Sequence, residues 1–186
     1  MSLIMQASAQ MELSDQASAR LRADMAPRAA VQALLDAGEV QEALKLTARL
    51  LPKRYVVAWL CQCARDQKLS VEDRAGASLA EKWARDPSEE NRRAAFEFAN
   101  AGGYKSLGAW IAASAGWAGG SLAPAKLEVQ APPPEYLTAR AGVAAVNLMA
   151  AQVADQFEAR RISFIQRAMD LLEVRKEAHG QAERSA

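Results

Sequence analysis

The side chains that could act as nucleophiles or metal ligands are few in this chain. Its 186 residues include one histidine, His179, close to a polar C-terminal end, and two cysteines, Cys61 and Cys63. A single histidine in such a place excludes a multi-histidine metal site and histidine-based activation of a nucleophile. The two cysteines lie roughly 200° apart around a helix, so a disulfide between them is not expected. We interpret them as small core residues in a reducing compartment, with reactive or metal-binding thiols as the alternative.

Sequence motifs for catalysis or phosphate binding are also absent. The chain contains no Walker-type GxxxxGKS or GxxxxGKT string and no GxGxxG, GxSxG or HExxH string. The acids Asp86, Glu89 and Glu90 fall in the first turn of an expected helix, where the helix dipole and the free amide groups account for them. We therefore predict that the protein is not an enzyme and has no catalytic residue, metal site or cofactor. An enzyme that works with carboxylates and arginines, without histidine, is one alternative.

The charge balance narrows the class of partner. The 23 basic and 22 acidic side chains leave a net charge of +1, which gives no strong positive field for nucleic acid or an anionic membrane. An uncharged window covers residues 106–125, but its glycine, serine, proline and alanine content contributes little to membrane insertion. No secretory signal begins the sequence. These features predict a cytoplasmic protein that binds neither nucleic acid nor membrane.

Apolar residues recur at three- and four-residue spacing over most of the length, which predicts an all-α protein. We expect a single-domain irregular or orthogonal bundle of about seven to nine helices over residues 26–178. Residues 1–25 are predicted to form a flexible or loosely docked segment, and residues 179–186 a disordered tail.

Several local signals mark the expected helix ends. Pro27 and Gly38 fit the first turn and the end of one helix, and Ser70 with Asp73 resembles a capping box. The sequence 86–89, Asp-Pro-Ser-Glu, predicts another helix start with Asp86 as its N-cap. The run 55–63 is apolar on nearly every side, which predicts the central helix of the domain.

A proline-rich segment, residues 122–134, interrupts the helical pattern. It contains four prolines, three of them consecutive, and is expected to form an extended, polyproline-like crossover on the surface. Trp117 stands just before it and could receive a partner segment together with the prolines, although plain packing of the crossover is the alternative. The predicted partner-binding residues are Trp117, Leu122, Pro124, Pro132, Pro133, Arg92 and Arg93.

Three segments together carry a family resemblance: 83–95 (WARDPSEENRRAA), 119–124 (GGSLAP) and 132–141, with its triple proline and LTARA end. As a set they resemble an uncharacterised bacterial family of small helical proteins encoded near type VI secretion genes. The resemblance covers residues 27–172 and implies no activity that can be carried over. It implies a cytoplasmic accessory, adaptor or chaperone-like role, with a component of the secretion system as partner.

The sequence thus predicts a non-enzymatic protein that binds another protein. A second alternative is a structural or regulatory helical subunit that forms a homodimer. The small residues of segment 139–150 would suit that role, because they let a neighbouring helix approach closely.

Overall fold

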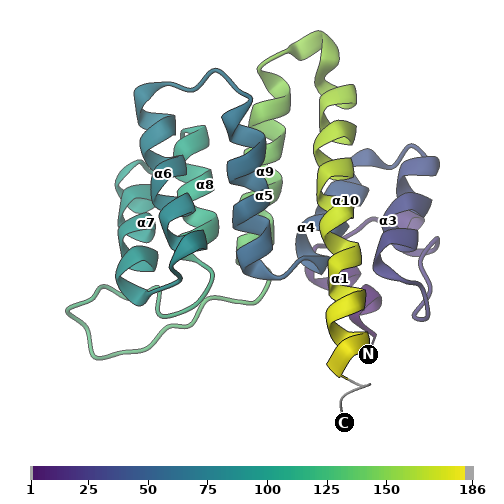
Figure 1. Cartoon of the computed structure of the whole chain (residues 1–186), viewed down its shortest axis with the longest axis horizontal. Coiled ribbons are helices and arrows are strands. Elements are labelled where there is room, and N and C mark those ends of the chain that lie inside the picture. Colours follow the sequence, from purple (N-terminus) through teal and green to yellow (C-terminus); the bar gives the residue numbers. More distant parts are fainter. Residues whose placement is uncertain (1, 183–186) are drawn as a thin grey trace. The chain divides into compact units, whose positions relative to one another are not determined.

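The computed structural model confirms an all-α bundle (Figure 1). It describes residues 2–182, with side chains as far as residue 172. Helices make up 69% of the chain, and the described residues include ten α-helices and no strand. The helical spacing of apolar residues was therefore sufficient to identify the fold class.

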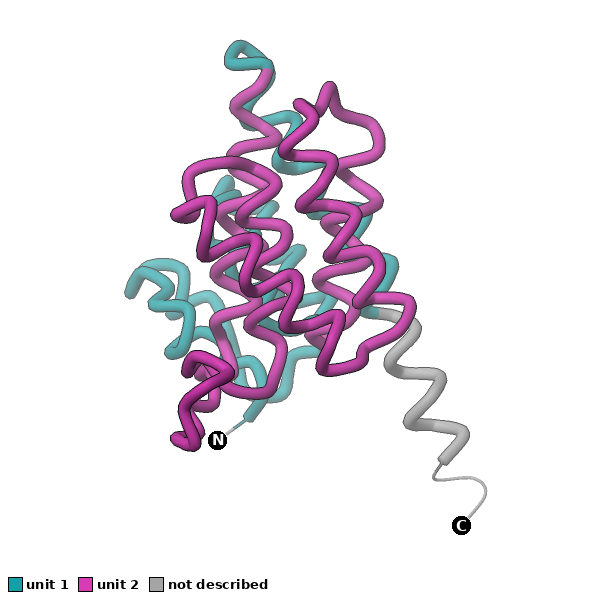
Figure 2. Tube along the Cα trace, turned by 90° about the vertical axis from the view of Figure 1, so that its left-hand side faces the viewer, with its two compact units in different colours: residues 1–51, 153–186 teal, residues 52–152 magenta. Residues whose placement is uncertain are grey.

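The chain divides into two compact units, coloured separately in Figure 2. Unit 1 comprises residues 1–51 and 153–186, and unit 2 comprises residues 52–152. The helices of unit 1 are α1 (Leu3–Gln10), α2 (Asp15–Ser18), α3 (Pro27–Asp36), α4 (Val40–Leu50), the 3₁₀ turn η1 (Ala154–Gln156) and α10 (Phe157–Ala182). The helices of unit 2 are α5 (Lys53–Arg65), α6 (Val71–Arg85), α7 (Glu89–Ala101), α8 (Leu107–Gly116) and α9 (Leu137–Ala151). The sequence pattern predicted one domain over 26–178 because it does not record which helices pair.

In unit 1, α3 and α4 form a helical hairpin that α10 covers from one side. Gly38 ends α3 with a φ of +74°, a left-handed conformation that glycine adopts without strain. The segment predicted to be flexible or loosely docked instead contains α1 and α2, and α1 packs on α4. Ile4, Ala7 and Met11 are buried there. Of the predicted tail, residues 179–182 continue α10, and residues 183–186 lie outside the described residues.

In unit 2, α8 is the central helix, with α6, α7 and α9 packed around it. Every residue of α8 except Trp110 is buried, which accounts for the uncharged window in the sequence. We expected the run 55–63 to be central, but it belongs to α5, which packs mainly on α6 and α9 and leaves Tyr55 exposed. The reason is spacing: Gly76 and Gly108 let α6 and α8 meet backbone to backbone, so α8 is enclosed more tightly.

The helix-end signals are confirmed at most positions. The Ser70 hydroxyl accepts a hydrogen bond from the Asp73 N–H at 3.0 Å and caps α6. For α7, however, the N-cap is Ser88 and not Asp86. Asp86 ends α6 instead, and its carboxylate accepts a hydrogen bond from the Asn91 side chain at 3.1 Å. The predicted start of α7 was therefore two residues too early.

The small residues of α9 are used inside unit 2. Ala139, Ala141, Ala145 and Ala150 are buried, and α9 packs on both α8 and α5. The Thr138 hydroxyl also donates a hydrogen bond to the Ser114 carbonyl of α8 at 3.0 Å. This face is consequently not exposed for dimerisation, which removes the feature on which the homodimer alternative was based.

No single helix among the described residues is long and apolar enough to cross a membrane. The segments Leu137–Ala151 and Ala154–Leu172 reach the length and apolar composition of a membrane span only when they are counted together.

Candidate functional site

The connection between α8 and α9 forms a projecting loop with a closed neck (Figure 1). At the neck, the Leu122 N–H donates to the Ala131 carbonyl at 2.7 Å. The Ala131 N–H in turn donates to the Ser121 hydroxyl at 2.9 Å, and the Ser121 side chain is buried. We call residues 121–131 the crossover loop. These hydrogen bonds tie the two ends of the loop together.

The far part of the crossover loop exposes two large apolar side chains. Leu127 is 56% exposed and Val129 is 67% exposed, which places both among the most exposed apolar residues described. A turn in which the Leu127 N–H donates to the Pro124 carbonyl at 3.0 Å sets the bend before them. Lys126, Glu128 and Gln130 are exposed as well. The loop therefore offers apolar contact area flanked by charged and polar groups.

Arg92 of α7 holds the beginning of the crossover loop. Its guanidinium donates to the Gly116 carbonyl at 2.5 Å and to the Ser121 carbonyl at 3.4 Å. Two further bonds of 2.6 Å join it to both carboxylate oxygens of Glu89. We expected Arg92 on an exposed partner-binding face, but only 3% of the residue is exposed. Its contribution is to position the loop, since it has almost no surface with which to touch a partner.

Arg93 and Gly120 also hold the beginning of the loop, and we call Arg92, Arg93 and Gly120 together the anchor. Arg93 donates to the Ala123 carbonyl at 3.0 Å and lies 5.6 Å from the centre of the Phe96 ring. Gly120 has a φ of +64°, and a Cβ atom built there would lie 2.5 Å from the Arg92 Nε atom. The anchor thus needs a glycine at 120 for both conformation and space.

Trp117 belongs to a cluster of three aromatic rings, with Tyr104 and Trp110. The Tyr104 ring centre lies 5.7 Å from that of Trp110 and 5.3 Å from that of Trp117, and the two tryptophans are 6.1 Å apart. All three residues are half-buried. Burial raises the pKa of Tyr104, and a hydrogen bond with Trp117 partly opposes that rise. This aromatic cluster presents ring surface next to the start of the crossover.

Tyr104 and Trp110 were missed in the sequence. Trp110 looked like a core residue, although its seven-residue spacing from Trp117 places both on one helix face. Tyr104 adopts a φ of +56°, which is uncommon for a residue other than glycine. Its position directly after the pair 102–103 was the signal available, because a helix end there places Tyr104 in the turn that leads into α8.

The remaining predicted residues lie along the crossover. Leu122 is half-buried at the neck, and Pro124 is exposed on the loop. Beyond the neck, Pro132 is exposed and Pro133 half-buried. Trp117 directly follows α8, Leu122 and Pro124 lie in the crossover loop, and the triple proline lies in the connection that leads from the loop to α9.

Comparison with known proteins supplies a family. A family of unknown function, DUF6931, matches residues 30–172. The chain belongs to this family. The DUF6931 match includes α7, the aromatic cluster and the whole crossover loop, and its description assigns no role to any of them. No curated protein and no solved structure matches the chain.

Both cysteines of this DUF6931 chain are buried and neither forms a disulfide, in keeping with the core interpretation. The Cys61 thiol donates a weak hydrogen bond to the Ala77 carbonyl at 3.8 Å. Burial raises the pKa of Cys61 to about 12, so the reactive thiolate is not formed near neutral pH. Within the described part of the chain, no three His, Cys, Asp or Glu residues are placed to hold a metal ion.

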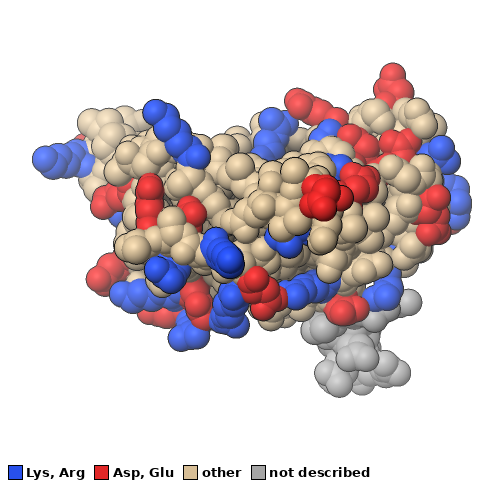
Figure 3. All heavy atoms as spheres, turned by 90° about the horizontal axis from the view of Figure 1, so that it is seen from above, with Lys and Arg blue, Asp and Glu red and all other residues tan. Residues whose placement is uncertain are grey.

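Asp86 and Glu89, two of the acidic residues considered as catalytic groups, have structural partners. Asp86 binds Asn91, and Glu89 binds Arg92. The hydrogen bond from Arg92 lowers the pKa of Glu89, so this carboxylate stays charged at neutral pH. Figure 3 shows basic and acidic side chains interspersed over the face in view, as the sequence composition implies.

Proposed function

We propose that this DUF6931 protein is a non-enzymatic accessory protein that binds another protein through the crossover loop and the aromatic cluster. The main support is the exposure of Leu127 and Val129 on a loop whose neck and base are fixed. Apolar and aromatic anchors provide most of the affinity in typical protein interfaces. Exposing them on an ordered element lowers the entropy cost of binding.

The anchor gives the loop a shape before any partner arrives. Arg92 and Arg93 bind three carbonyls between residues 116 and 123, and the neck bonds close residues 121–131. A charged side chain buried to this extent is rarely kept unless its hydrogen bonds hold a particular structure. So many hydrogen bonds to one connection favour a binding role for the loop over a role as a simple linker.

We further propose that the partner is a component of a contractile, type VI-like secretion system. The support is the resemblance of segments 83–95, 119–124 and 132–141 to proteins encoded near such genes. Two of these segments carry the anchor and its glycine, so the same residues support both the binding site and its context.

The test is capture of partners by the full-length protein from a native lysate of its source cells. The double variant Leu127→Ser with Val129→Ser is compared with Val71→Ser, a matched control at a residue of α6 that is 77% exposed. We expect mass spectrometry to identify a protein that wild type and Val71→Ser recover and the double variant loses. Equal recovery with the loop variant, or no reproducible partner, would contradict the proposal.

A further inference from the structure

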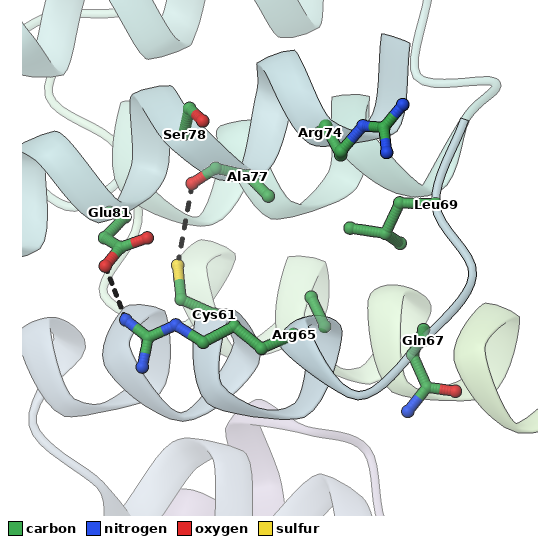
Figure 4. Close-up of a pocket in the computed structure, with 9 residues that line it drawn as sticks. Cys61, Arg65, Gln67, Leu69, Arg74, Ala77, Ser78 and Glu81 are labelled. Atoms are coloured by element: carbon green, nitrogen blue, oxygen red, sulfur yellow. Dashed lines mark hydrogen bonds and ion pairs between the residues drawn. The ribbon is translucent and has the colours of Figure 1, made fainter. Parts of the chain in front are cut away.

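A cavity of about 330 Å³ lies between α5 and α6, near the turn that joins them (Figure 4). The small side chains of Cys61, Ala64 and Ala77 line it, and we call these three its floor. Leu69 lies at the end near the turn. The volume is at the lower end of the range for small-molecule sites, which suits a ligand with few heavy atoms. This cavity is separate from the crossover loop and from the aromatic cluster.

The rim of the cavity carries more positive than negative charge. Arg65 and Arg85 both donate to the same carboxylate oxygen of Glu81, at 2.5 Å each. Arg74, from the opposite wall to Arg65, lines the cavity and has no side-chain hydrogen bond or ion pair to any described residue. Of the charged residues that line the cavity, Arg65 and Arg74 are basic and Glu81 is acidic. Because Glu81 already binds Arg65 and Arg85, Arg74 is the lining group still able to bind an anion.

The floor, in contrast, favours an apolar group. The Cys61 thiol is protonated and already donates to the Ala77 carbonyl. No buried side-chain atom that lacks a hydrogen-bond partner among the described residues belongs to a residue that lines the cavity. A ligand atom on the floor thus meets methyl, methylene and thiol groups and no unsatisfied donor or acceptor.

We propose that this cavity binds a small organic carboxylate with a short apolar arm. The carboxylate binds the Arg74 guanidinium at the rim, and the arm lies between Ala64 and Ala77 with its end towards Leu69. A free metabolite and the C-terminal residue of a protein both carry this chemistry. The shared features are a single negative charge and an aliphatic group small enough for the cavity.

The test is a titration of the full-length protein, followed by backbone amide NMR shifts, with hexanoate, its uncharged amide and acetate. We expect saturable shifts centred on Cys61, Leu69 and Ala77 with hexanoate. Loss of the charge-assisted hydrogen bond in the amide costs roughly tenfold to hundredfold in affinity. Arg74→Gln is expected to cause a similar loss for hexanoate. Lys82→Gln, an exposed residue of the same helix outside the cavity lining, removes the same charge without affecting binding.

Three results would overturn the proposal: no saturable shift with hexanoate, equal binding by Arg74→Gln, or equal binding of acetate, which would indicate an adventitious ion only. A short peptide ending in leucine separates the two sources. Tighter binding of this peptide than of hexanoate indicates a protein C-terminus, and weaker binding indicates a free small molecule. The loop variant Leu127→Ser with Val129→Ser keeps this binding, so failure here and failure of the proposed function are distinguishable.

Discussion

At the scale of single residues, Arg92 is the side chain on which the crossover most depends. Replacing it with methionine keeps the length but leaves the Gly116 and Ser121 carbonyls without their donor. We expect the free energy of unfolding to fall by about 2–4 kcal/mol, because buried acceptors that lose a charged donor are costly. Chemical denaturation measures the change. Glu89→Gln is the control and should cost about 1 kcal/mol or less, since the Glu89 side chain is 61% exposed and the ion pair is screened. Equal costs for the two variants would contradict this role of Arg92.

The stability that the Glu89 carboxylate contributes should depend on pH. Its pKa in the folded protein is lowered from 4.5, mainly by the hydrogen bond from Arg92. Burial opposes this as the second-largest effect, and the charges of Arg92 and Arg93 lower the pKa by smaller amounts. A carboxylate with a lowered pKa stabilises the folded state fully above its unfolded pKa, and this contribution is lost as the pH falls through the folded value. We expect wild type to be more stable than Glu89→Gln at about pH 7, with the difference shrinking at about pH 3. Denaturation curves of both proteins at the two pH values measure it, and a constant difference would exclude the effect.

Arg92 and Arg93 also explain a limit of sequence reasoning at this scale. The two neighbours are identical in type, and we predicted both on a partner-binding face. Only Arg92 is fully buried, and its partners Gly116 and Ser121 lie 24 and 29 residues further along the chain. The residues next to Arg92 and Arg93 in the sequence do not indicate which of the two will contact these distant carbonyls. Trp117, in contrast, was selected from local signals, the glycines and prolines beside it, and its role in partner binding stays a prediction.

At the scale of helices, the contact of α6 with α8 depends on two glycines. A Cβ atom at Gly76 would lie only 2.2 Å from the backbone oxygen of Gly108, so the two helices would have to separate. Alanine usually stabilises a helix by about 1 kcal/mol relative to glycine. For Gly76→Ala we expect the opposite, a loss of about 2 kcal/mol or more from overpacking. Thermal and chemical denaturation decide the sign. Gly119→Ala is the control, because its Cβ would meet nothing within 4 Å, and its effect should stay within about 0.5 kcal/mol.

The contact of α6 with α8 also shows that helix ends are easier to predict from the sequence than helix packing. Helix ends are local, so Gly38 and the Ser70 cap were predicted correctly. The central helix was not, because hydropathy favoured the larger apolar residues of 55–63. What encloses α8 is the close approach that Gly76 and Gly108 permit, and the pattern does not show that these two glycines face each other.

At the scale of the whole molecule, the two units differ in how the chain builds them. Unit 2 is continuous, from residue 52 to residue 152, whereas unit 1 joins the two ends of the chain. The central helix α8 has α5, α6, α7 and α9 as neighbours, and all of them lie in unit 2. The anchor, the crossover loop and the cavity also lie entirely within it. Both proposed sites therefore belong to one continuous segment.

This organisation predicts that residues 52–152 fold without the rest of the chain. A fragment of that length is within the usual size of an independent domain, and it keeps the neighbours of α8. We expect a helical circular dichroism spectrum and one cooperative unfolding transition, with the tryptophan fluorescence of the folded aromatic cluster. Gly76→Ala in the fragment should lower the transition midpoint as it does in the full chain, because residues 76 and 108 both lie within the fragment. A fragment that unfolds without a transition, or that aggregates at all concentrations, would show that unit 2 needs unit 1 and that the single domain predicted over 26–178 is the better description.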